Sequence, residues 1–121
     1  MELVVVSVLG SYGIDAGPVD GLTGVWSAER RKIGSIGVHV SRGVTTHGFA
    51  VNVNNDLQPF EWIVPCGIDH CRMTSVAREL ASEQDMAVFG DRVASEFGRV
   101  YEREPTAVSP ARLEELQPVA A

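Results

Sequence analysis

The chain has 121 residues and a mass of 13.0 kDa, enough for one domain with a single core and too short for two independent domains. Its 45% hydrophobic residues and mean hydropathy of +0.05 predict that it folds, and no apolar run approaches the roughly 18 residues that span a bilayer. The net charge of −6 argues against a nucleic-acid binder, whose contact surface is basic, and favours small molecules or proteins as partners.

The first residues are ambiguous between two kinds of element. Over residues 1–12 the apolar side chains recur at helical spacing, but the β-branched run Val4-Val5-Val6 also suits a strand. The segment has neither the basic region nor the cleavage site of a signal peptide. Because two cysteines are too few for the disulfide framework of a small secreted domain, we expect a cytoplasmic protein with reduced thiols and no membrane association.

Two alternating segments predict a β-hairpin. Residues 32–40 and 44–53 each alternate with period two, and Ser41-Arg42-Gly43 forms the expected loop between them. A symmetric three-residue loop puts Val40 opposite Val44 and, counting back, residue 32 opposite residue 52. No acidic residue occurs between Glu29 and Asp56, although four basic ones do, so this hairpin either attracts an acidic partner or simply has a basic exposed face.

Short helices are expected after the hairpin. Residues 57–63 can form a helical turn before Pro65-Cys66-Gly67 bends the chain. Thr74 or Ser75 can cap a short helix through Leu80, and Ser82 or Asp85 can begin a longer one to about Tyr101. We expect residues 104–121 to be a loose, flexible tail. The longer helix has an apolar stripe that predicts core packing, made of Met86, Phe89, Val93, Phe97 and Val100.

Cys66 is the candidate nucleophile. Pro65 fixes the approach of the chain, and Gly67 leaves a backbone N–H unobstructed, so this N–H could bind a developing oxyanion when a thiolate attacks a carbonyl. Free cysteines are also among the most buried residues, so a structural role competes with the catalytic one.

Lys32 is the candidate partner of this cysteine. A nearby ammonium favours the thiolate, and burial disfavours the charged amine, which could then act as a base toward an incoming amine. Its even parity with Ile36, Val38 and Val40 predicts that it starts from the buried face, although it could instead mark only the exposed beginning of the strand. His47 could orient a substrate or donate a hydrogen bond within the core.

Other chemistries receive less support. A metal site could combine Cys66, His70 and Cys71 with His39 or His47, but the spacing of the cysteines matches no usual zinc motif. The sequence contains neither the Gly-x-Ser-x-Gly of serine hydrolases nor a glycine-rich phosphate-binding motif. We therefore expect no metal and no cofactor.

Five segments, in order and spacing, resemble the lipoyl(octanoyl) transferase family, over about residues 3–103 and most closely between Gly24 and Ser75. The segments are Gly24-Val25-Trp26, Arg31-Lys32-Ile33-Gly34-Ser35-Ile36-Gly37-Val38, Thr46-His47-Gly48-Phe49-Ala50-Val51-Asn52-Val53, Val64-Pro65-Cys66-Gly67-Ile68 and Thr74-Ser75.

The resemblance implies an α/β fold of the α+β type, with a mixed sheet flanked by helices as in lipoate and biotin protein ligases, over a partial catalytic domain at residues 1–103. It also implies transfer of an octanoyl group from acyl carrier protein to a lysine of a lipoyl domain, in 2-oxoacid dehydrogenases or the glycine cleavage H protein. Cys66 would carry the acyl group as a thioester, and Lys32 would be the acid/base. The residues implied for substrate binding are Ser35, Gly37, His47, Gly48, Phe49, Ala50 and Gly67.

One part of the family pattern is not found. The Arg-Gly-Gly run and the His-x-Pro-Gly-Gln motif that precede these segments in the family do not occur here, so the chain resembles the carboxy-terminal half of the enzyme, with the amino-terminal part missing. Two interpretations follow. The chain is an octanoyltransferase, or it is an inactive truncated remnant that acts only as a partner-binding fragment, for example toward a separately encoded amino-terminal half.

Overall fold

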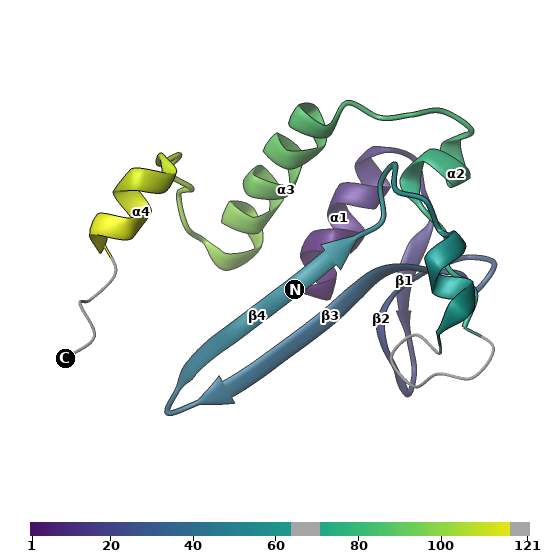
Figure 1. The fold of residues 1–121 in the computed structure, drawn as a ribbon, viewed down its shortest axis with the longest axis horizontal. Helices are drawn as coiled ribbons and strands as arrows, with labels where there is room; N and C mark the ends of the chain where they lie inside the picture. The colour runs from purple at the N-terminus through teal and green to yellow at the C-terminus, as the bar shows by residue number, and fades with distance from the viewer. Residues whose placement is uncertain (64–70, 117–121) are drawn as a thin grey trace.

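A helix, α1 (Glu2–Ser11), begins the fold in the computed structural model, which describes residues 1–63 and 71–116 (Figure 1). A helix forms here because it gathers the buried side chains on one face, whereas a strand would divide them between two. Those side chains are Val4, Val5, Val8 and Leu9. Burial thus outweighs the strand preference of the valine run.

Four antiparallel strands follow, and each pairs with the next: β1 (Ala16–Val19), β2 (Leu22–Ser27), β3 (Lys32–Ser41) and β4 (Val44–Val51). The sequence pattern does not predict β1 and β2, whose glycines and proline are poor strand formers. Where a mixed sheet is expected, the four named strands are all antiparallel, and the described residues add one isolated parallel bridge, between Lys32 and Met73.

The predicted hairpin is present as β3 and β4, but its register differs from the expected one by one residue. Arg42 and Gly43 alone form the turn, with φ values of 51° and 80°. Positive φ at both central residues defines a type I′ turn, whose twist matches that of the flanking strands. Val40 therefore pairs with Thr45 and not, as the three-residue loop predicts, with Val44.

The helices predicted after the hairpin are confirmed. They are the 3₁₀ helix η1 (Gln58–Trp62), α2 (Val76–Leu80) and α3 (Met86–Tyr101). The Ser75 hydroxyl caps α2 by accepting a hydrogen bond from the Arg78 N–H at 3.2 Å. A further helix, α4 (Pro110–Leu116), forms within the segment that the sequence predicts to be loose.

Helix α3 packs against α1 (Figure 1). The ring of Phe89, near the beginning of α3, lies 5.6 Å from that of Tyr12, the residue directly after α1. At the other end the Met1 amino group donates a hydrogen bond to the Tyr101 hydroxyl at 3.2 Å, so the two helices run antiparallel. Their shared core also includes side chains from the sheet and α2, namely Val25, Ile33 and Val76.

The expected core stripe of α3 is only partly correct. Phe89 is buried, but Met86 is 57% exposed and Phe97 is 38% exposed. The rings of Phe97 and Tyr101 stack on each other with centroids 4.5 Å apart, and Tyr101 is 40% exposed. Contacts with α1 and its flanking residues continue from Phe89 to Tyr101, so Phe97 is exposed because of the side of α3 on which it lies.

Asp85→Ala should lower the free energy of unfolding by about 1 kcal/mol. The Asp85 carboxylate caps α3 by accepting hydrogen bonds from the Ala87 and Val88 N–H groups at 2.8 and 3.1 Å, and alanine cannot replace them. Urea unfolding followed by circular dichroism measures the effect. Asp91→Ala, an exposed position within the same helix, is the control and should change stability by less than about 0.5 kcal/mol. Equal losses in both variants would contradict the capping role.

Candidate active site around Lys32

Lys32 is the only lysine of the chain, and it is 1% exposed. Lysine is almost never fully buried, so this position is unusual for its type. The residue begins β3. Its backbone pairs with β2 on one side and with residues 72–74 on the other. Its N–H donates to the Arg72 carbonyl at 2.7 Å, and its carbonyl accepts from the Thr74 N–H at 2.9 Å. The interpretation of Lys32 as an exposed strand end is therefore wrong.

A β-bulge turns the Lys32 side chain to the face opposite the one that the sequence pattern predicts. Val25 pairs with Gly34 and Trp26 pairs with Lys32, so β3 has one extra residue, Ile33, relative to β2. Val25 packs into the core beneath α1, whereas the Lys32 side chain lies beside Trp26. Neighbouring residues of β2 point to opposite faces. Lys32 is buried as expected, but it does not share the face of Ile36 and Val38.

Gly24 and Trp26 form the surroundings of the lysine side chain. The Lys32 Nζ lies 5.5 Å from the centroid of the Trp26 ring, within the range of a cation–π interaction. A Cβ at Gly24 would lie 2.8 Å from the Lys32 Cε and 2.6 Å from the Gly34 carbonyl oxygen. The missing side chain at Gly24 is thus what makes room for the lysine. Trp26 is 4% exposed, and among the described residues its Nε1 has no hydrogen-bond partner.

An ion-pair network fixes the residue before Lys32. The Arg31 guanidinium contacts the Glu79 carboxylate of α2 at 3.0 Å and the Glu29 carboxylate at 3.2 Å. The hydroxyl of the buried Thr74 donates a short hydrogen bond to Glu79 as well. The network therefore ties the beginning of β3 to α2 and to the segment that pairs with Lys32.

Four of the residues implied for substrate binding lie together on one face of the hairpin. Ser35 is directly opposite Ala50, and Gly37 is directly opposite Gly48. Since these pairs alternate with residues whose side chains pack on the core, they lie on the face away from α1. A Cβ added at Gly37 or Gly48 would meet no atom within 4 Å. The face is consequently open around these two pairs, whose side chains are all small.

The other two described candidates, His47 and Phe49, do not join this group. Phe49 pairs with Ile36, and both pack against the core cluster. His47 is exposed, which excludes a hydrogen bond within the core, and its φ of 73° is rare for a residue other than glycine. Such strained positions cluster at functional sites. His47 therefore remains a candidate because of its backbone conformation.

Cys66 and Gly67, the proposed nucleophile and oxyanion donor, lie outside the described residues, as does His70. The described chain resumes at Cys71, which is half-buried and has its Sγ 3.8 Å from the Met73 Sδ. Met73 is the bridge partner of Lys32, so residues 71–73 lead directly to the lysine. Within residues 1–63 and 71–116, no three metal-binding side chains are grouped closely enough to hold an ion.

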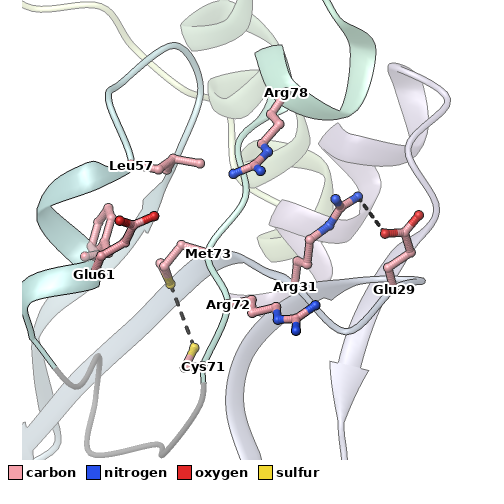
Figure 2. A pocket seen from close by; sticks show the side chains of 9 residues that line it. Glu29, Arg31, Leu57, Glu61, Cys71, Arg72, Met73 and Arg78 are labelled. Carbon is pink, nitrogen blue, oxygen red and sulfur yellow. Dashed lines mark hydrogen bonds and ion pairs between the residues drawn. The ribbon is translucent and has the colours of Figure 1, made fainter.

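A pocket of about 430 Å³ opens next to this segment, between η1 and residues 71–78 (Figure 2). Leu57, Phe60 and Met73 supply its apolar wall. The charged residues around it are Glu29, Arg31, Glu61, Arg72 and Arg78. Sequence reasoning did not find this pocket, because its residues come from separate parts of the chain.

Helices packed on one face of an antiparallel sheet define an α+β domain, with a buried lysine where β3 begins. The profile described as the lipoyl protein ligase A/B catalytic domain matches residues 1–98, and the chain belongs to this family. The resemblance drawn from the five sequence segments is thereby confirmed. No helix in the described part of the chain is long and apolar enough to cross a membrane.

Curated relatives support the same assignment. The chain is 44% identical over 115 residues to an octanoyltransferase of Myxococcus xanthus, covering 91% of this chain and 32% of the relative. It is 46% identical over 104 residues to the octanoyltransferase of Solibacter usitatus, covering 86% and 46%. The octanoyltransferase of Synechococcus elongatus is 40% identical over 117 residues, covering 97% and 48%. The chain thus spans less than half the length of each of these relatives.

Proposed function

We propose that this chain carries the catalytic lysine and cysteine of an octanoyltransferase, which moves an octanoyl group from acyl carrier protein to a lysine of a lipoyl domain. The acceptors would be lipoyl domains of 2-oxoacid dehydrogenases and the glycine cleavage H protein, and the reaction needs no cofactor. The observation that carries the proposal is the complete burial of the only lysine, in a notch that Gly24 leaves open beside Trp26. Membership of the family supplies the type of reaction.

The reaction would proceed in two acyl transfers. In the first, the Cys66 thiolate attacks the carbonyl carbon of the donor thioester, a new C–S bond forms, and the donor leaves as a thiolate that takes up the proton of the Lys32 ammonium. In the second, the amine of the acceptor lysine attacks the Cys66 thioester, an amide bond forms, and Cys66 leaves as the thiolate. Lys32 would accept the proton that the attacking nitrogen loses, and its ammonium would then stabilise the thiolate.

The small residues of the hairpin would receive the hydrocarbon chain. Ser35, Gly37, Gly48 and Ala50 leave an open face along β3 and β4, against which an acyl chain could lie without displacing protein atoms. Phe49 would support β4 from the core side, and the Gly67 N–H would donate to the oxyanion. His47, exposed and with a strained backbone, would contact substrate from the same hairpin.

Incubation with octanoyl-acyl carrier protein should add one octanoyl group to the chain at Cys66. Intact-mass spectrometry before and after treatment with neutral hydroxylamine, which cleaves thioesters, measures the adduct. Cys66→Ser should abolish it, and Cys71→Ser, the matched control, should keep it.

Two outcomes would contradict this proposal. An adduct that survives in Cys66→Ser would place the nucleophile elsewhere. A folded chain that forms no adduct at all would favour the second interpretation, a fragment that binds a partner without activity of its own. Circular dichroism of the same samples establishes that each variant is folded.

A further inference from the structure

The pocket beside the candidate site is bordered by two arginines that pair with no side chain among residues 1–63 and 71–116. Among the described residues, neither the Arg72 nor the Arg78 guanidinium makes a hydrogen bond or an ion pair, whereas Arg31 is held by Glu29 and Glu79. Figure 2 shows the Arg78 side chain reaching from α2 over the pocket and the Arg72 side chain at its lower edge. Both groups are therefore available to a ligand.

Three arginines and two glutamates line the pocket, whereas acidic residues outnumber basic ones in the whole chain. Arg31 is shared between Glu29 and Glu79, and beside this ion-pair network a ligand entering the pocket meets Arg72 and Arg78 against the carboxylate of Glu61. The whole chain carries a net charge of −6. Two arginines beside a concave surface favour a phosphate, because guanidinium groups bind its oxygens in a bidentate manner.

The apolar wall indicates what else the ligand carries. Leu57, Phe60 and Met73 are among the lining residues, and the pocket of about 430 Å³ is much larger than a bare phosphate. A phosphate on a flexible, partly apolar arm would fill it better. The pocket also lies close to the candidate site, because Arg72 accepts the backbone hydrogen bond of Lys32 and Met73 is its bridge partner.

We propose that Arg72 and Arg78 bind the phosphate of the 4′-phosphopantetheine arm that carries the donor acyl group on acyl carrier protein. The proposal rests on the proposed function for the identity of the donor. The phosphate sits between the two guanidinium groups, the arm passes over Met73, and its terminal thioester reaches the side of the sheet where Lys32 lies. The arginines would thereby set which donors are accepted, since an acyl thioester without the phosphate lacks this anchor.

Binding of the arm alone tests the proposal without requiring any acyl transfer. Isothermal titration with 4′-phosphopantetheine and with pantetheine, which lacks the phosphate, should give at least tenfold tighter binding of the phosphorylated probe. The double variant Arg72→Gln/Arg78→Gln should bind both probes equally. Arg103→Gln/Arg112→Gln removes the same charge from exposed positions after α3 and should keep the preference.

The remaining outcomes separate this proposal from others. Equal binding of the two probes to the unmodified chain, or an unchanged preference in Arg72→Gln/Arg78→Gln, would overturn it. In a second arm, holo- and apo-acyl carrier protein are compared: if the double variant weakens both equally, the arginines recognise acidic side chains of the carrier protein and not the arm. A phosphate preference without any Cys66 adduct would contradict the proposed function while leaving the pocket assignment standing.

Discussion

Lys32→Met is expected to slow transfer of the octanoyl group from Cys66 to a lipoyl domain by about 10²–10⁴-fold, the usual contribution of a positioned acid/base. Methionine fills nearly the same volume, so the free energy of unfolding should change by less than about 1.5 kcal/mol. The rate is measured in single turnover, from the decay of the isolated acyl-enzyme after addition of the lipoyl domain. Stability is measured by urea unfolding.

Lys32→Arg is the matched control, because it separates the two roles proposed for the lysine. Arginine keeps the positive charge that favours the thiolate but remains protonated and cannot serve as a base. Formation of the Cys66 adduct should therefore be less impaired in Lys32→Arg than in Lys32→Met, while the second transfer is slow in both. A Lys32→Met variant that acylates the lipoyl domain at the unmodified rate would remove Lys32 from the mechanism.

The sequence predicts local elements well where one physical signal dominates. Asp85 and Ser75 cap helices as expected, since their side-chain oxygens satisfy N–H groups that no helical bond can reach. The hairpin of β3 and β4 follows from period-two alternation. These features depend on residues near one another in the chain.

Features that depend on distant pairing were harder to predict. The hairpin register depends on whether Ser41 belongs to the turn, and the positive φ at Arg42 that makes a two-residue turn has no strong composition signal. The face on which Lys32 lies depends on the bulge at Ile33, which arises only when β3 pairs with β2. Alternation within β3 alone therefore predicted correctly that Lys32 is buried, but it assigned the side chain to the wrong face of the sheet.

The site itself was only partly predictable. The pairing of Ser35 with Ala50 and of Gly37 with Gly48 follows from the hairpin, so the small-residue face could have been derived with the correct register. Glu79 could not have been linked to Arg31, since the two residues are 48 positions apart and meet only when α2 packs beside β3. Gly24 and Trp26 belong to one of the five sequence segments that resemble the family, but only the fold reveals that they surround the lysine.

Gly24→Ala should damage both stability and activity, because Gly24 shapes the space in which Lys32 lies. Its φ of 123° is a conformation that side chains rarely permit, and its added Cβ would lie 2.6 Å from the Gly34 carbonyl oxygen. Backbone strain and overpacking each cost roughly 1–3 kcal/mol. We expect the free energy of unfolding to fall by about 3 kcal/mol in urea unfolding experiments.

Displacement of the lysine should be detectable separately from the loss of stability. The same Cβ would lie 2.8 Å from the Lys32 Cε, so at temperatures where Gly24→Ala remains folded its second acyl transfer should still be slowed at least tenfold. Gly17→Ala, in β1, is the control, since its Cβ would meet nothing within 4 Å and its φ is not in the positive range. If Gly24→Ala were as stable as Gly17→Ala and equally active, the close approach of Lys32 to this glycine would have no role in holding the side chain.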